Sequence, residues 1–123
     1  MEKICLVDMD GTLFDYEGQL RTDLSKLKSP EEVDPLDTKI DLWDSKNPWM
    51  EERIKLIKNQ PNWWRTLPLR ADGVRLFELA GKVGFCRKIL TKGPSSQSTA
   101  WSEKLEAIKH HFGDDLPVDI VGK

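Results

Sequence analysis

The sequence predicts an α/β fold in which a parallel sheet is interrupted by a helical insertion. An apolar run at residues 3–7 and an alternation of helix and strand patterns after residue 68 predict the sheet. Between residues 16 and 67 the composition changes, and four of the five tryptophans fall there among prolines and helix-start signals. We therefore expect an α/β core of residues 1–15 and 68–123, with residues 16–67 as a helical insertion.

The first strand is predicted at residues 3–7. Its apolar run is continuous rather than alternating, which is typical of a strand covered on both faces in a parallel sheet. This pattern indicates a central strand.

The second half of the chain alternates helices with strands. Its pattern predicts a helix over residues 72–82, a strand over 85–91, a helix over 98–112 and a strand over 118–121. Gly113 would end the second of these helices in a left-handed cap. The order is that of βαβ units, so the strands are expected to be parallel.

Two helix starts are predicted within the insertion. Ser29 to Glu32 has the serine, proline and glutamate of a reciprocal capping arrangement. A second helix should begin at Pro48 and end before Pro61. Its apolar positions share one face: Met50, Ile54 and Ile57.

Composition excludes several classes of function. The 19 basic and 21 acidic side chains nearly balance, so binding to polymeric nucleic acid or to an anionic membrane is not expected. No apolar run approaches the roughly 20 residues of a bilayer span, and no signal peptide is recognisable. Cys5 and Cys86 lie in apolar strand patterns, which predicts buried, reduced thiols and a cytoplasmic location.

Residues 8–13, with the sequence DMDGTL, hold the strongest chemical signal. Asp8 and Asp10 lie two apart at the end of a strand, so their carboxylates are expected to share a pocket beyond the carboxyl edge of the sheet. Paired carboxylates repel each other unless a cation lies between them, and their oxygens suit Mg²⁺.

The same stretch can support attack on phosphorus. Asp8 is the candidate nucleophile, which would form an aspartyl-phosphate, and Asp10 is the candidate acid and base. Gly11 permits a tight backbone, and Thr12 offers a hydroxyl at the mouth of the site. Both are predicted to contact the substrate.

Residues 8–13 resemble the first signature of the haloacid dehalogenase superfamily, which includes many phosphatases. The resemblance implies a Rossmann-like parallel sheet, incomplete at its C-terminus, with an inserted α-helical cap. It also implies that Thr91, at the end of the next strand, binds phosphate together with the loop that begins at Lys92. The family's lysine on the following helix is matched by Lys104, which would neutralise the phosphoryl charge.

Two further stretches are similar to the 5'(3')-deoxyribonucleotidases of this superfamily. They are residues 61–68 of the predicted cap and residues 102–113 of the last predicted helix. This similarity implies a nucleoside monophosphate as substrate, with aromatic residues packing on its base. Phe14 and Trp64 are the expected base contacts.

The sequence departs from the family pattern at its end. Family members continue to a strand followed by an acidic pair that completes the magnesium site, whereas Asp114 and Asp115 follow a helix-ending glycine and resemble that pair in letters only. Lys92 also stands where the family has a small residue. We expect weaker magnesium binding and a first strand left as an uncovered edge that invites pairing.

The expected function is that of a Mg²⁺-dependent 5'-nucleotidase. A phosphatase for another small phosphate ester is the alternative enzyme. The other alternative is an inactive fragment or subunit that forms a homo-oligomer or needs a complementing C-terminal chain. A separately encoded second half, a truncated gene product and a protein that has lost catalysis all remain open.

Overall fold

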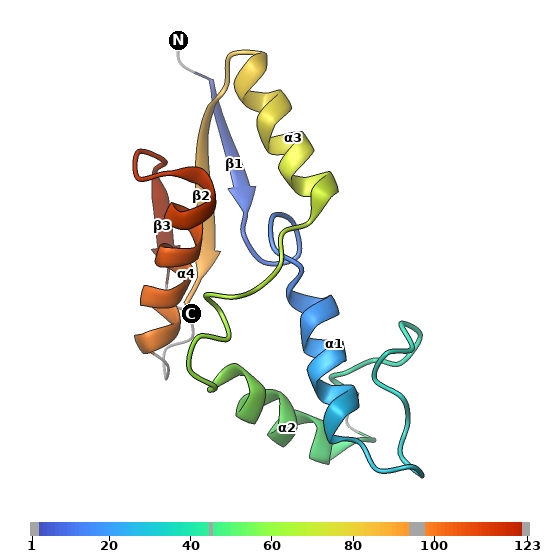
Figure 1. Cartoon of the computed structure of the whole chain (residues 1–123). Helices are drawn as coiled ribbons and strands as arrows, with labels where there is room; N and C mark the ends of the chain where they lie inside the picture. The colour runs from blue at the N-terminus through green and yellow to red at the C-terminus, as the bar shows by residue number, and fades with distance from the viewer. Residues whose placement is uncertain (1–2, 45, 94–97, 122–123) are drawn as a thin grey trace.

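The computed structural model describes residues 3–44, 46–93 and 98–121 (Figure 1). Strands and helices alternate in the second half, as the sequence predicts. The elements in chain order are β1 (Ile4–Asp8), α1 (Tyr16–Leu27), α2 (Pro48–Lys58), α3 (Ala71–Lys82), β2 (Cys86–Lys92), α4 (Ser98–Phe112) and β3 (Val118–Val121).

The three strands form one parallel sheet in the order β1-β2-β3. Ile4 of β1 is in register with Cys86 of β2, and Ile89 of β2 with Val118 of β3. Parallel neighbours need a crossover between them, which α3 and α4 supply. The predicted α/β class and parallel sheet are confirmed.

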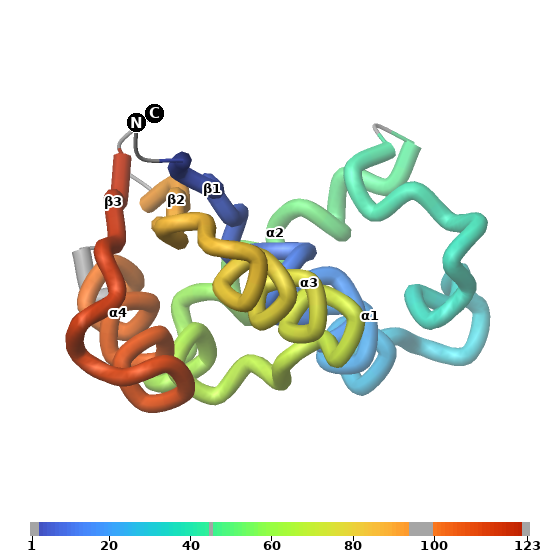
Figure 2. Tube along the Cα trace, turned by 90° about the horizontal axis from the view of Figure 1, so that it is seen from above, coloured from blue at the N-terminus to red at the C-terminus, as the bar shows by residue number. Residues whose placement is uncertain are grey.

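Both crossover helices lie on the same side of the sheet, as Figure 2 shows from above. Residues facing these helices are buried, among them Val7 and Ile89. On the other face Ile4, Leu6 and Leu90 are 59%, 61% and 38% exposed. We call this second surface the bare face.

The prediction that the first strand is central and covered on both faces is wrong. Within the described residues β1 pairs with β2 alone, and its outer edge has no strand beside it. Successive parallel crossovers share one handedness, so two connections in the order β1-β2-β3 place both helices on one side. The expectation of an uncovered edge at the first strand agrees with the structure.

Residues 16–67 leave the sheet and place α1 and α2 beyond the carboxyl ends of the strands (Figure 1). The chain leaves and returns at adjacent points. Asp15 N–H donates to the Pro68 carbonyl at 2.8 Å, and Arg70 N–H donates to the Leu13 carbonyl at 2.8 Å. The excursion is therefore anchored at its base to the loop that follows β1.

Local signals explain both helices of the excursion. The Asp15 carboxylate caps α1 by accepting a hydrogen bond from Gly18 N–H at 3.1 Å. Pro48 lies in the first turn of α2, as predicted. The two helices pack through buried apolar residues, namely Leu20, Leu24, Met50, Ile54 and Ile57.

The predicted helix start at Ser29 is wrong. Glu32 does accept a hydrogen bond from Ser29 N–H at 2.6 Å, as in a capping arrangement, but the described residues from there to Asn47 form turns. Aspartates cause this outcome, because their carboxylates accept bonds from the N–H two residues ahead and so compete with a helix. They are Asp34, Asp37, Asp41 and Asp44.

Arg21 holds this irregular segment against α1. Its buried guanidinium donates to the carbonyls of Pro35, Asp37 and Ile40 at 2.9–3.0 Å. One cation thus satisfies three backbone carbonyls that no helix or sheet would satisfy.

No helix in the described part of the chain is long and apolar enough to cross a membrane. Neither cysteine is in a disulfide. Cys5 is half-buried, but Cys86 is exposed at the start of β2, contrary to the predicted burial, because its side chain belongs to the bare face.

Candidate functional site

The ammonium group of Lys104 contacts two other predicted catalytic residues, Asp10 and Thr91, and the backbone of Lys92. Its Nζ lies 2.8 Å from Asp10 Oδ2, 3.2 Å from Thr91 Oγ1 and 2.6 Å from the Lys92 carbonyl oxygen. Lys104 is 1% exposed and Thr91 is 2% exposed. An ammonium has three N–H donors, so these three oxygens use all of them.

The topology explains why these positions meet. β1 and β2 are parallel neighbours, so the loop after Asp8 and the end of β2 emerge at the same edge. Thr91 is two residues after the buried Ile89, so its side chain is on the face that α3 and α4 cover. From this side, α4 supplies Lys104.

A tight loop presents Asp10 to that lysine. The Met9 carbonyl accepts hydrogen bonds from both Leu13 N–H and Phe14 N–H, at 3.1 and 3.0 Å. Gly11 has a φ of 82°, a left-handed conformation that favours glycine. The carbonyl of the exposed Gly11 accepts a hydrogen bond from the Arg70 guanidinium at 2.9 Å. Arg70 follows residues 16–67 in the chain, so this bond fixes the loop to the point where the chain returns to the sheet.

Helix α3 closes tightly over the same loop. A Cβ added at Gly73 would lie 1.7 Å from the Thr12 carbonyl oxygen, a distance that no side chain can occupy. Thr12 itself is half-buried. The start of α3 therefore fixes the backbone between Asp10 and the excursion.

The two predicted carboxylates have different surroundings. Asp10 is half-buried and bonded to Lys104, whereas Asp8 is exposed at the end of β1. By the alternation of a strand, Asp8 shares the bare face with Ile4 and Leu6. Among the described residues, no hydrogen bond or ion pair involves the Asp8 carboxylate, which is thus open to a ligand.

One oxygen of the Asp10 carboxylate has no bonding partner among the described residues. Asp10 Oδ1 is buried and has no hydrogen-bond partner in the described part of the chain, which suits an oxygen that binds a hard cation. The described residues contain no group of three or more His, Cys, Asp or Glu side chains that could hold a metal. Asp114 and Asp115 are exposed between α4 and β3, at the opposite end of the sheet, and do not contribute.

The predicted base contacts are both buried. Phe14 is 0% exposed and packs edge-on against Phe112, with ring centroids 6.4 Å apart, and against His111 at 5.6 Å. Trp64 is 3% exposed and lies over Lys104, with Nζ 4.4 Å from the ring centroid. In this structure neither ring offers an open face to a nucleobase.

An aromatic cluster surrounds Trp64. Tyr16 stacks on it at 5.6 Å with an interplanar angle of 15°, and Trp63 meets it edge-on at 4.9 Å. Burial, and to a lesser extent the negative charges of Asp10 and Glu17, raise the pKa of Tyr16 to about 12. Sequence reasoning missed Tyr16, because the first residue of an amphipathic helix has no chemical signature.

Lys92 contributes through its backbone. Its side chain is exposed, while its carbonyl accepts from Lys104. The predicted phosphate-cradling loop beyond it includes residues 94–97, which lie outside the described residues.

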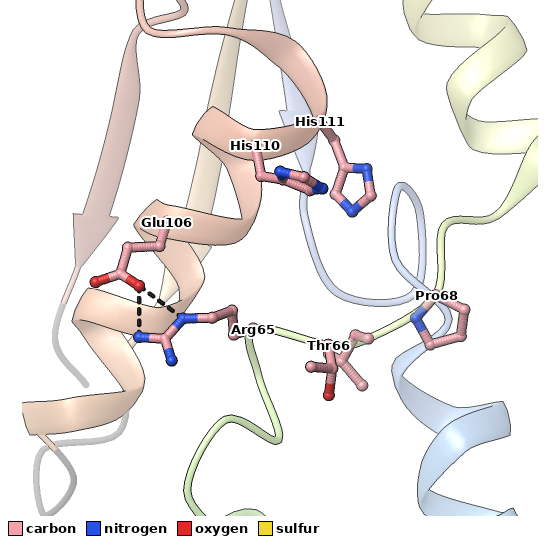
Figure 3. Close-up of a pocket in the computed structure, with 7 residues that line it drawn as sticks. Arg65, Thr66, Pro68, Glu106, His110 and His111 are labelled. Carbon is pink, nitrogen blue, oxygen red and sulfur yellow. Dashed lines mark hydrogen bonds and ion pairs between the residues drawn. The ribbon is translucent and has the colours of Figure 1, made fainter.

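A separate cavity of about 580 Å³ lies beside the second half of α4 (Figure 3). An ion pair between Arg65 and Glu106 crosses it, and burial together with the neighbouring His110 lowers the pKa of His111. Its lining contains none of the predicted catalytic residues and consists of Arg65, Thr66, Leu67, Pro68, Glu106, His110 and His111.

No protein-family model matches the chain, and no curated protein is significantly similar to it.

Proposed function

We propose that this protein is a Mg²⁺-dependent phosphomonoester hydrolase that acts on nucleoside monophosphates, deoxynucleotides among them. One observation carries the proposal: Lys104 donates hydrogen bonds to Asp10 and Thr91, which are far apart in sequence. The order of these three residues along the chain resembles the order of the phosphatase signatures described above. A buried cation beside a carboxylate and a hydroxyl at the carboxyl edge of a parallel sheet suits a phosphoryl group.

The residues have distinct roles in the proposed reaction. Asp8, which is exposed, attacks phosphorus and forms an aspartyl-phosphate as the alcohol leaves. Asp10 gives the leaving oxygen its proton and later takes one from the attacking water. Lys104 and Thr91 stabilise the charge that develops on the phosphoryl oxygens. Gly11, Thr12 and Lys92 would contact the substrate beside them.

Mg²⁺ would be held by the Asp8 carboxylate, the backbone carbonyl of Asp10 and water, and when bound it would supply positive charge to the phosphoryl oxygens. Hard cations of this kind keep several waters, so two protein ligands fit a weakly held ion. The substrate class comes from the resemblance of residues 61–68 and 102–113 to deoxyribonucleotidases. Because Phe14 and Trp64 are buried, base recognition by these two rings requires the excursion to open.

Phosphate release tests the proposal. The protein is assayed with nucleoside monophosphates and sugar phosphates, with and without Mg²⁺, beside Asp8→Asn and Lys104→Met. We expect Mg²⁺-dependent release that Asp8→Asn lowers by at least about a thousandfold. Lys109→Met, on an exposed position of the same helix, is the matched control and should keep wild-type activity. Equal activity in wild type and Asp8→Asn would refute the assignment of the nucleophile.

A second candidate function is that of a subunit that binds phosphate without turnover until a partner chain completes it. The bare face favours this candidate, because parallel sheets normally have both faces covered. Light scattering beside the same assay separates the two. An active monomer supports the enzyme, whereas an inert, well-folded protein that gains activity with a partner supports the subunit.

A further inference from the structure

Trp64 lies against the Lys104 ammonium in addition to its three hydrogen-bond acceptors. The Nζ atom lies 4.4 Å from the ring centroid, while its three donors go to Asp10, Thr91 and the Lys92 carbonyl. Both side chains are almost completely buried, at 3% and 1% exposure. The charged group is thus enclosed by three oxygens and one aromatic face.

Bonds between its own segment and α4 hold Trp64 in place. Asn62 N–H donates to Glu103 Oε2 at 3.2 Å, and Arg65 forms an ion pair with Glu106. Two positions of α4 that lie one turn apart, Glu103 and Glu106, therefore bind residues on both sides of Trp64 in the chain. Tyr16 stacks on the indole as well, so the ring has little freedom to move away from Lys104.

The face of the Trp64 ring, rather than its N–H group or its size, is the feature that suits the Lys104 ammonium. Trp64 Nε1 is buried without a hydrogen-bond partner in the described part of the chain, so the polar end contributes nothing there. An aliphatic residue of similar size would leave the ammonium against hydrocarbon, which is costly for a charge. An aromatic face attracts a cation and replaces water at that side.

We propose that Trp64 is a positioning residue for Lys104, which holds the ammonium against Asp10 and Thr91 through its ring face, and is not a platform for a nucleobase. The longest of the three bonds from Lys104 is the one to Thr91 Oγ1. In the proposed reaction a phosphoryl oxygen replaces Thr91 as the acceptor of this bond, while Trp64 keeps the ammonium in place. The kinetic part of this proposal rests on the proposed function. The position of Lys104 does not.

The first test measures access to Lys104 without any substrate. The protein is treated briefly with acetic anhydride, and acetylation of Lys104 is compared by peptide mass spectrometry with that of Lys55, whose side chain is 62% exposed. Lys104 should be protected in the wild type and in Trp64→Phe, which keeps an aromatic face. In Trp64→Leu its relative acetylation should rise about tenfold.

Trp63→Leu is the matched control. Trp63 packs against Trp64 and Tyr16 and donates to Asp23 at 2.8 Å, but no contact between it and Lys104 is recorded among the described residues. Its loss should disturb the cluster and leave Lys104 protected. Equal exposure of Lys104 in Trp63→Leu and Trp64→Leu would overturn the proposal. Should Trp64→Leu fail to fold, Trp64→Met, an unbranched replacement, takes its place in the same comparison.

The second test separates positioning from binding in the active enzyme. Trp64→Leu should lower kcat about tenfold with KM within about twofold, and Trp64→Phe should restore most of kcat. A rise in KM with unchanged kcat would instead make Trp64 a substrate contact and overturn the proposal. If the wild type releases no phosphate, the proposed function fails, and the acetylation comparison alone decides the role of Trp64.

Discussion

The two faces of the sheet differ in what covers them and in the chemistry that they carry. On the face covered by α3 and α4, Ile89 and Thr91 are buried and Lys104 has every donor occupied. On the bare face, Leu6 is 61% exposed and Asp8 meets solvent. The charged network around Lys104 is thus protected from water on one face, while the Asp8 carboxylate remains exposed at the carboxyl end of β1.

Truncation of one apolar residue on each face gives the largest expected difference. Ile89→Ala should lower the free energy of unfolding by about 2–5 kcal/mol, because it opens a cavity in a buried position. Leu6→Ala on the bare face should cost less than about 1 kcal/mol. Urea unfolding followed by circular dichroism measures both. Similar losses would show that the bare face is covered in solution.

Titration of Tyr16 tests the closed side of the site. It is the only tyrosine in the chain, so the absorbance of tyrosinate reports on it alone. Its folded pKa of about 12 exceeds the ordinary value of 10.0, so the folded state holds the proton more tightly. Stability from this group is complete below pH 10 and is lost as the pH rises toward 12, by about 2–3 kcal/mol.

Tyr16→Phe should remove this alkaline loss, which thermal unfolding at a series of pH values would show. A tyrosinate midpoint near pH 10 in the folded protein would mean that the aromatic cluster around Trp64 is open to water.

The smallest effect is expected from an ion pair on the bare face. Lys88 Nζ lies 2.7 Å from Asp119 Oδ2, with side chains 35% and 50% exposed. Lys88→Met should cost less than about 1 kcal/mol, and the difference from wild type should shrink as salt is added. Melting temperatures at low and high ionic strength measure it. A loss that salt leaves unchanged would place this pair in a covered environment.

Local signals in the sequence predicted much of the fold. Pro48 and the apolar positions after it predicted α2, and the periodicity after residue 68 predicted α3, β2, α4 and β3 to within about one residue, well inside the usual uncertainty of helix ends. The order of Asp10, Thr91 and Lys104 along the chain predicted three positions that the structure brings together. The helices and strands depend on near neighbours in sequence, which a pattern reveals directly, whereas the three site positions came from the resemblance in motif order to a known family.

What the sequence did not predict depends on packing between distant segments. An apolar run cannot tell whether one face of β1 or both will be covered. Strand alternation does not extend to Asp10, which lies beyond the end of β1 in a turn, so the strand pattern did not predict its bond to Lys104. The contact of Trp64 with Lys104 joins residues from two separate parts of the chain, and neither residue type predicts it alone.

The distance in sequence between paired strands also affects the order in which the molecule folds. β2 and β3 are joined through α4 alone, whereas the whole excursion and α3 separate β1 from β2. Pairing β1 with β2 closes the longer loop and so has the higher entropic cost. We therefore expect β2, α4 and β3 to associate first and β1 to dock last. Thr91 and Lys104 belong to the early unit, and Asp8 and Asp10 arrive with the late strand. A chain interrupted before that final step would have the lysine without either carboxylate.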